Sequence, residues 1–360
     1  MLSDKHIIHE KYRAERSMEL AAACDITANC IAVVLYDLAM ERRYARSVAF
    51  GMEVTPQNAA EELSRLLVTA VREYSVKPRA VKRVGIAAPV HIESELERSL
   101  TSDDMGLEVS CEILFVPYIS AGISGRFTAS LLTLPVEGDW MAASFGKELC
   151  IAHMTGGELH GASYPMEGAF DGTALESGMP AENGAIDTVR RDSDKTVSYE
   201  VVGDGESIGI SPCGAFTAAA VMQRDGILDS DGIMTDRDNF FIGEDFFISQ
   251  NDIRAIQADK ARAAAALELL PRTDGQVFFS GEPFSAAGGF RALMEIGAVP
   301  ERFRNAAFCR NSTEQGIIAF LEDENTRNRA FELVSSVKDI SRDKLPKYDK
   351  NYLNNLNFLL

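Results

Sequence analysis

Residue types that carry metal and redox chemistry are few and scattered in this 360-residue chain. It has five histidines and six cysteines, and no two cysteines have the C-x-x-C spacing of zinc sites and ferredoxin-type clusters. No histidine belongs to an H-E-x-x-H pattern. The sequence therefore predicts neither an iron–sulfur cluster nor a metal centre.

Long apolar runs are missing as well. No segment approaches the ~18 consecutive apolar residues that a membrane-spanning helix needs. The charged residues at the start of the chain include no apolar stretch of the kind that forms a secretion signal. We therefore expect a cytoplasmic protein without a membrane partner.

Basic residues are outnumbered by acidic ones, 36 to 54, which gives a formal net charge of −18. Such an excess repels phosphate backbones, so we expect no nucleic-acid partner. Solubility alone can explain an acidic surface. The alternative is a protein partner with a basic patch.

The first half of the chain shows an α/β pattern. Two apolar runs around Thr27–Asn29 predict a hairpin, and a third strand is expected at 42–50. A helix at 57–74 follows, with apolar residues at helical spacing. Further strands and helices then alternate as far as a break at 135–139.

The same order of elements recurs after this break. A second hairpin is expected around 145–147, followed by a third strand and a glycine-rich, helix-forming stretch at 168–178. Two strands come next, and the longest helix is expected near 249–270. The repeat predicts two lobes with a ligand cleft between them, each a mixed five-stranded sheet with helices. The expected divisions are an arm (1–18), a first lobe (19–138), a second lobe (139–345) and a tail (346–360).

Several motifs of the second half resemble one family, the ATP-dependent reductive activators of corrinoid proteins, in their C-terminal actin-like domain. The matching segments are Ala169-Phe170-Asp171-Gly172, Gly184-Ala185-Ile186-Asp187, Cys213-Gly214-Ala215-Phe216, Gly226–Gly232 and Ser249–Lys260. The last resembles the family's T-Q-x-D-I-R-x-x-Q-x-A-K helix. The resemblance implies two actin-like (ribonuclease H-like) lobes, as in acetate and sugar kinases, chaperone ATPases and actin.

The resemblance also implies a nucleotide site made from hairpin turns, helix starts and a strand end. In that family, ATP with magnesium drives a change of shape. The residues of this chain that match such a site are Asp25, Thr27, Asn29, Ser144, Gly146, Asp171, Gly214, Gly281 and Glu282.

This chain departs from the family at those motifs. The first hairpin keeps Asp25 but loses a glycine and two threonine hydroxyls. In the second hairpin Ala142 replaces an acid and Phe145 occupies the tip, and Glu282 replaces a glycine at the adenosine turn. A further acid is missing near Arg126. One lost positioning group of this kind can cost ~3 kcal/mol of barrier, so we predict weak or no ATP binding and negligible turnover.

Several of these residues also have a purely structural interpretation. Asp25 either organises a metal or caps a turn at the end of a strand. Asp171 either lines the cleft or complements a helix dipole. Arg254 and Lys260 are expected to form helix-surface pairs with nearby acids, and Gly288-Gly289 is expected to permit close helix packing.

Three functions follow from these observations. The first is a degenerate accessory protein that binds a corrinoid protein or a corrinoid-dependent methyltransferase. The second is an active ATPase or kinase with rearranged ligands, and the third is a structural or regulatory pseudo-ATPase unrelated to cobalamin. Full-length activators carry an iron–sulfur domain; without a cluster motif, this chain is not expected to supply the electron. Homodimerisation stays open.

Overall fold

The computed structural model describes residues 19–37, 39–50, 54–118, 123–135, 138–192, 196–235, 238–341 and 345–358. The predicted arm, 1–18, lies outside these ranges. The chain forms two compact units. The first consists of Met1–Leu134 and Asn311–Ser335, and the second of Pro135–Arg310 and Ser336–Leu360.

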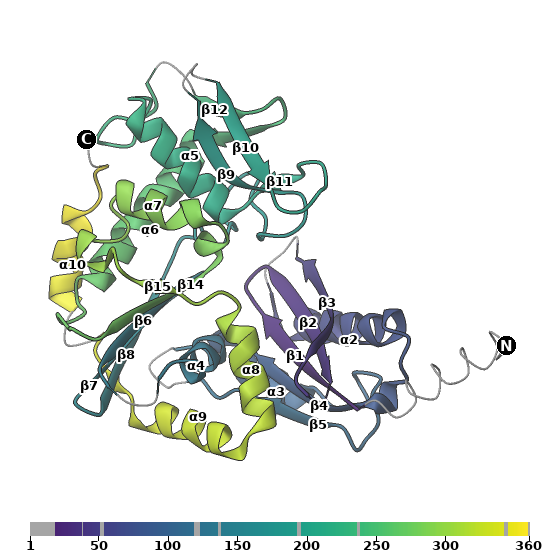
Figure 1. Ribbon diagram of the computed structural model, residues 1–360. Coiled ribbons are helices and arrows are strands. Elements are labelled where there is room, and N and C mark those ends of the chain that lie inside the picture. Colours follow the sequence, from purple (N-terminus) through teal and green to yellow (C-terminus); the bar gives the residue numbers. More distant parts are fainter. Residues whose placement is uncertain are drawn as a thin grey trace, which may run out of the picture. The chain divides into compact units, whose positions relative to one another are not determined.

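The first unit is an α/β unit around one mixed sheet (Figure 1). The strand order β3-β2-β1-β4-β5 has antiparallel pairing from β3 to β1 and parallel pairing from β1 to β5. The predicted five-stranded mixed sheet is thus confirmed here. Its elements are β1 (Leu20–Ile26), β2 (Cys30–Asp37), β3 (Arg42–Ala49), α2 (Pro56–Glu73), η1 (Pro78–Ala80), β4 (Val81–Ala87), α3 (Val90–Ser99), β5 (Glu112–Phe115), α4 (Gly125–Leu132), α8 (Ser312–Glu322) and α9 (Glu324–Ser336).

Helix α2 illustrates how the sequence forms these elements. Thr55 and Asn58 make a reciprocal capping box, and Pro56 occupies the first turn, where its missing N–H costs nothing. The predicted apolar face is buried, and its members are Ala59, Leu63, Leu66, Leu67, Ala70 and Val71. This face joins the core that covers the sheet.

Helix α8 belongs to the first unit, although it lies within the 139–345 segment that the sequence assigned to the second lobe. It packs against α4, β1 and β4. The approach is close because Gly316 has no side chain: a Cβ there would lie 1.9 Å from the Ala129 carbonyl oxygen. Ile317 of α8 is fully buried beside Gly85. Burial of α8 therefore overrides the division expected from chain order.

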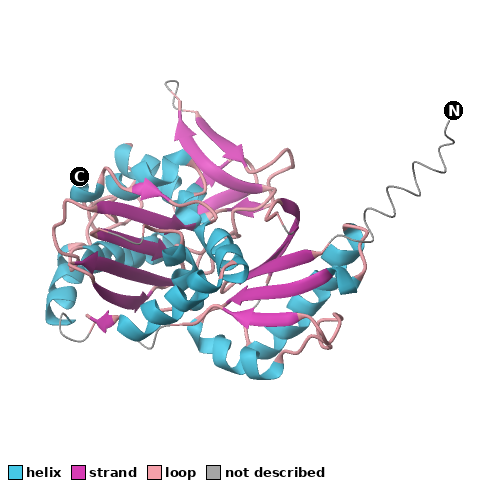
Figure 2. Ribbon diagram, turned by 60° about the horizontal axis from the view of Figure 1, so that its bottom comes forward, coloured by secondary structure: helices cyan, strands magenta, loops and turns pink. Residues whose placement is uncertain are grey.

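The described residues of the second unit form three sheets (Figure 2). The largest has six strands in the order β15-β14-β6-β7-β8-β16, and β10-β9-β11 and β12-β13 form two smaller sheets. Its elements are β6 (Trp140–Phe145), β7 (Glu148–Thr155), β8 (Glu158–Pro165), β9 (Ala185–Arg191), β10 (Val197–Val201), β11 (Gly209–Ile210), α5 (Pro212–Arg224), β12 (Asn239–Ile242), β13 (Phe246–Ser249), α6 (Gln250–Leu267), β14 (Gln276–Gly281), η2 (Glu282–Phe284), α7 (Ala287–Glu295), η3 (Glu301–Phe303), β15 (Ala307–Phe308), β16 (Lys338–Asp339) and α10 (Leu345–Asn354).

Three details of the second unit differ from the sequence-based expectation. The large sheet has six strands rather than five, because short β15 and β16 extend its edges while β9 and β10 form their own sheet. The β12–β13 hairpin was not foreseen. The 168–178 stretch forms turns and not a helix. Gly168 (φ +122°) and Gly172 (φ +82°) adopt backbone conformations incompatible with an α-helix.

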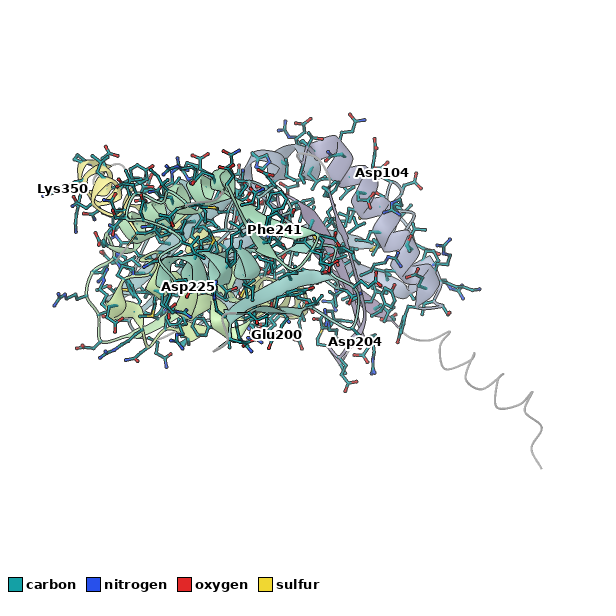
Figure 3. All side chains as sticks on the ribbon, turned by 90° about the horizontal axis from the view of Figure 1, so that it is seen from above. Asp104, Glu200, Asp204, Asp225, Phe241 and Lys350 are labelled. Atoms are coloured by element: carbon teal, nitrogen blue, oxygen red, sulfur yellow. The ribbon has the colours of Figure 1, made fainter. Side chains whose placement is uncertain are left out.

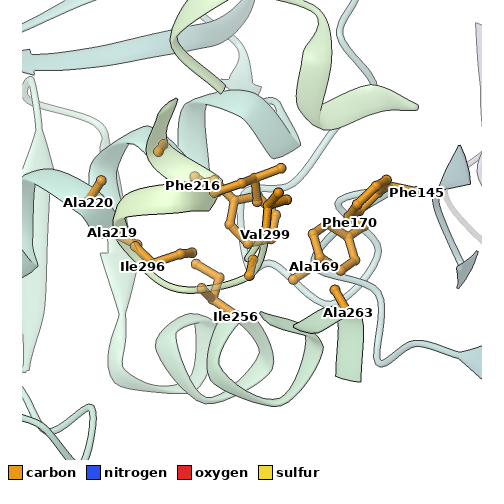
Figure 4. Packing of buried hydrophobic residues seen from close by; sticks show 14 of the residues in the cluster. Phe145, Ala169, Phe170, Phe216, Ala219, Ala220, Ile256, Ala263, Ile296 and Val299 are labelled. Carbon is orange, nitrogen blue, oxygen red and sulfur yellow. The ribbon is translucent and has the colours of Figure 1, made fainter. Parts of the chain in front are cut away.

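The family-like helix α6 lies at the centre of this unit. Ser249 and Asp252 form a second capping box at its start. Ile256 and Ala263 face the apolar core together with Phe216 and Val299 (Figure 4). The predicted long helix is thus confirmed.

Arg254 and Lys260 of α6 do not form the expected surface ion pairs. Arg254 donates to the Asp231 carbonyl oxygen at 2.6 Å. Lys260 is buried, and its ammonium donates to the carbonyl oxygens of Asn355 and Asn357, both at 2.7 Å. That expectation was wrong for Lys260 because the C-terminal residues cover its side of the helix, and for Arg254 because a backbone carbonyl of the 226–232 loop accepts its hydrogen bond.

The C-terminal segment is an integral layer of the second unit rather than a separate tail. Helix α10, in which Figure 3 labels Lys350, packs on α6. The Gln257 side-chain amide donates to the Leu356 carbonyl oxygen at 3.0 Å. Phe358 is buried, with its ring 5.0 Å from the Lys260 ammonium. Among the described residues, no helix is long and apolar enough to cross a bilayer.

Candidate functional site

The hairpin of the first unit places Asp25, Thr27 and Asn29 together. Asp25 stands in β1, and Thr27 and Asn29 form the turn into β2. The Thr27 backbone N–H donates to the Cys30 carbonyl oxygen at 2.8 Å, and the Thr27 hydroxyl donates to the Asn29 side-chain oxygen at 2.9 Å. These two hydrogen bonds close the turn between β1 and β2.

The Asp25 carboxylate is bound by a cation from its own unit. Arg126, in the first turn of α4, donates to both carboxylate oxygens, at 2.5 and 3.1 Å. Both side chains are largely shielded from solvent, with 21% and 28% exposed. Arg126 belongs to the tetrapeptide in which the family's acid is missing. Both carboxylate oxygens of Asp25 are therefore bound by one bidentate guanidinium.

A buried acid beside the start of α4 was missed by the sequence reasoning. Glu93 of α3 is 2% exposed, and a Cβ on Gly125 would lie 2.9 Å from its Oε2. Burial raises its pKa to about 8, against the opposing effect of hydrogen bonds from the Gly125 and Tyr118 backbone. Glu93 is thus a protonated neighbour of α4 at neutral pH. Its position in the first turn of α3, four residues after Pro89, was the available signal.

The hairpin of the second unit has a buried aromatic ring beside its tip. Ser144 and Phe145 end β6, and Gly146 and Lys147 form the tip before β7. Phe145 is only 2% exposed, and its ring packs edge-on against Phe170 and Phe284, with both centroid distances 5.1 Å (Figure 4 shows the first pair). Ala142 is buried opposite Ala152. Phe145 and Ala142 therefore contribute to the packing of the core.

Lys147 is the exposed cation of the same tip. Its ammonium donates to the Glu167 carbonyl oxygen at 3.0 Å and contacts the Thr173 hydroxyl at 3.4 Å. The Asp171 carboxylate accepts from the Thr173 backbone N–H at 3.1 Å and its hydroxyl at 2.7 Å. Burial raises the pKa of Asp171. Asp171 thus stabilises the turn that replaces the expected helix.

The 167–169 turn is held by a residue that the sequence reasoning did not single out. Asp259 of α6 is fully buried, and its carboxylate accepts from the backbone N–H groups of Glu167, Gly168 and Ala169, at 2.6, 3.0 and 2.8 Å. Three successive N–H groups form an anion-binding nest. In the resembling family motif this position is an alanine. Here the chain's own carboxylate fills the nest.

Gly281 ends β14 beside the second hairpin, and Glu282 begins η2. Gly281 has φ +124°, and a Cβ there would lie 2.1 Å from the Phe145 carbonyl oxygen. The Glu282 carboxylate accepts from the Ala181 N–H at 3.2 Å. The glycine therefore accommodates the hairpin backbone, and the contact with adenosine stays a prediction.

Gly214 lies in the first turn of α5, and its N–H donates to the N-cap hydroxyl of Ser211 at 3.0 Å. The same hydroxyl donates to Asp187, which also accepts from the Ser285 hydroxyl, both at 2.6 Å. Asp187 was seen only as part of a family motif. It ties the start of α5 to the turn before α7.

These arrangements determine what each unit can do chemically. Within the described parts of the chain, no cluster of three or more His, Cys, Asp or Glu side chains could hold a metal ion. Asp25, Asp171, Asp187, Asp259 and Glu282 all bind donors of their own unit. Each of these carboxylates is therefore already hydrogen-bonded within its own unit.

Comparison with known proteins places the chain beside corrinoid activators. The profile described as "C-terminal domain of RACo the ASKHA domain" matches residues 150–359. The corrinoid activation enzyme RamQ of Eubacterium limosum is 25% identical over an alignment of 212 residues that covers 51% of this chain and 36% of RamQ. A structure of a reductive activator for corrinoid, iron–sulfur protein superposes with a TM-score of 0.81 at 17% identity. The superposed region covers 96% of this chain and 66% of the activator chain. The match thus spans about a third of one relative and two thirds of the other.

Proposed function

Because this chain belongs to the family of the C-terminal ASKHA domain of RACo, we propose that it is an accessory protein of corrinoid activation. In this proposal it binds a corrinoid protein or a corrinoid-dependent methyltransferase through its actin-like body. ATP turnover has no part in the binding. The relatives named for corrinoid activation support the choice of partner.

The observation that carries the proposal is the Asp25–Arg126 pair. A magnesium ion organised by Asp25 would have to displace a guanidinium that makes two charge-assisted hydrogen bonds. Phe145 fills the second hairpin with an aromatic ring where the family exposes backbone to phosphates. The mechanism we infer is therefore recognition by a rigid scaffold, without a metal–nucleotide step.

Calorimetry tests the nucleotide half of this proposal. The wild-type protein, titrated with ATP and magnesium, is expected to show no binding tighter than about millimolar, a free energy of only about −4 kcal/mol. Micromolar binding would contradict the proposal. Steady phosphate release that Asp25→Ala abolishes would do the same, and would establish an active ATPase with rearranged ligands.

Direct binding tests the partner half. Corrinoid proteins and corrinoid-dependent methyltransferases of the source organism, purified singly, are titrated onto the immobilised chain with and without ATP. We expect one of them to bind equally well in both conditions. If none binds in either condition, the chain is a pseudo-ATPase unrelated to cobalamin.

A further inference from the structure

The β12–β13 hairpin exposes aromatic rings on its outer face. Its inward residues Phe240, Ile242 and Ile248 are buried in the core. The outward position Phe241 is 55% exposed, and its ring lies 5.7 Å from that of half-buried Phe247 on the paired strand. Outward positions of a half-buried hairpin are usually polar, because they face water. Packing of the hairpin on its own unit does not explain this aromatic pair.

A third aromatic ring adjoins the hairpin. Tyr199 of β10 is 40% exposed, and it lies against the hairpin turn: a Cβ on Gly243 would be 3.2 Å from the tyrosine ring. Aromatic residues are enriched in the cores of protein–protein interfaces, where they bury large areas at little entropic cost. We call Tyr199, Phe241 and Phe247 the aromatic surface.

The aromatic surface lies within the most acidic part of the chain. Residues 192–248 carry twelve acidic and three basic side chains, so this segment holds half of the net charge of −18. Glu244 and Asp245 are exposed in the hairpin turn itself, and Asp238 is exposed just before β12. Figure 3 looks onto this end of the second unit and labels Phe241 together with Glu200 and Asp204. Of these acids, Glu200 pairs with Arg190 at 2.8 Å.

An apolar centre with an acidic rim specifies the chemistry of a partner. Like charges across an interface are strongly unfavourable, whereas opposite charges speed encounter and fix orientation. A nucleic acid or an anionic membrane is therefore repelled. A second copy of this chain would bring the same acidic rim into contact with itself. The complementary surface is an apolar hollow surrounded by lysine and arginine.

We propose that the aromatic surface and its acidic rim are the docking site for the corrinoid-carrying partner protein, through a basic-rimmed apolar hollow on that partner. This proposal rests on the proposed function and adds the location and chemistry of the contact. Phe241 is the anchor, because it is the most exposed ring of the three. Glu244 and Asp245 provide the negative charge that attracts the basic residues of the partner.

The test measures binding of a purified corrinoid protein that binds the wild-type chain. Phe241→Ser removes the anchor, and Phe331→Ser is its matched control, because Phe331 is 56% exposed on α9 of the first unit. The pair Glu244→Lys and Asp245→Lys reverses the rim, with Glu108→Lys and Glu112→Lys, also exposed and in the first unit, as control. Circular dichroism verifies that each variant is folded.

We expect Phe241→Ser to weaken binding about tenfold or more, as loss of an aromatic anchor does. The charge reversal Glu244→Lys with Asp245→Lys should also weaken binding. Its effect should grow as the ionic strength falls, because salt then screens the charges least. Both controls should bind like the wild type. Equal binding by Phe241→Ser and Phe331→Ser would overturn this proposal while the proposed function stands.

Two other results also decide the matter. If no corrinoid protein binds even the wild type, both the proposed function and the docking site fail. If sedimentation shows that Phe241→Ser only converts a dimer into a monomer, the aromatic surface is a self-association face and the docking proposal is overturned.

Discussion

At the residue scale, Gly281 shows how one absent side chain brings two loops of the second unit together. Its positive φ and the short approach to Phe145 impose two separate constraints. The first is a conformational cost for any L-residue, and the second is a steric clash with backbone that cannot move aside. Another glycine of the same unit, Gly138, has φ +89° but open space around it.

Replacement of these two glycines by alanine separates the two constraints. Gly138→Ala should lower the free energy of unfolding by about 1 kcal/mol, the cost of the conformation alone. Gly281→Ala should cost clearly more, by at least about 2 kcal/mol, because the β6–β7 hairpin must shift. Urea denaturation of both variants measures the difference. Equal losses would mean that the hairpin yields freely.

Glu93 offers a second test at this scale, through pH. Its pKa of about 8 in the folded protein lies above the ordinary value of 4.5. Between those values the unfolded chain has lost the proton that the folded chain keeps, so this group makes stability fall as pH rises.

Glu93→Gln cannot ionise and should escape that loss. Relative to the wild type, the variant should gain roughly 2–4 kcal/mol between pH 5 and pH 8. Urea denaturation at the two pH values measures the gain. Glu95→Gln, exposed on the same helix, is the control and should show no such gain. A pH-independent difference for Glu93→Gln would show that Glu93 is ionised when buried.

At the element scale, helix α6 joins two parts of the second unit that are far apart in sequence. Asp259 holds the 167–169 turn, while neighbouring Lys260 holds the carbonyl groups of the C-terminal segment. Burial lowers the pKa of Lys260 to about 8 from 10.5. Between these values the unfolded chain binds the extra proton, so this group makes stability rise with pH.

Lys260→Met should abolish that rise. From pH 8 to pH 10.5 the stability of the wild type should improve relative to the variant by roughly 2–3 kcal/mol. The comparison cancels the titration of tyrosines and cysteines, which both proteins share. Lys350→Met, exposed on α10, should show no pH-dependent difference from the wild type. A constant offset for Lys260→Met would refute a titrating Lys260.

Elements with strong periodicity could be predicted from the sequence. The apolar runs of β1 and β2 and the capped, amphipathic α2 and α6 lie within a few residues of their expected positions. The turn at 168–178 could not be predicted, because its shape depends on a carboxylate ninety residues away. The Asp25–Arg126 pair joins residues 101 apart and was equally invisible. Long-range polar contacts leave no local pattern.

At the scale of the whole molecule, the two units are interleaved along the chain. The first unit is begun by residues before Leu134 and closed by α8 and α9 from Asn311–Ser335. Arg329 of α9 donates to the carbonyl oxygens of Leu132 and Leu134, at 3.2 and 3.1 Å. Neither stretch buries its apolar surface without the other.

This connectivity can be tested with fragments. Residues 19–134 alone should not show cooperative unfolding, because the surface that Ile317 covers near Gly85 would be exposed. The same residues joined to 311–335 by a flexible linker should fold. Circular dichroism during urea titration distinguishes the two. Ile317→Asp in the linked fragment buries a charge and should prevent folding. Cooperative unfolding of residues 19–134 alone would refute the requirement for α8.

The interleaving also sets an order of events during translation. After α4 leaves the ribosome, the 135–310 segment must be synthesised before α8 can pack against it. At ~5–20 residues per second this wait is on the order of ten to forty seconds. Throughout it, the apolar side of β1 and β4 is uncovered in the crowded cell. The half of the molecule that is synthesised first is completed only after most of the other half has emerged.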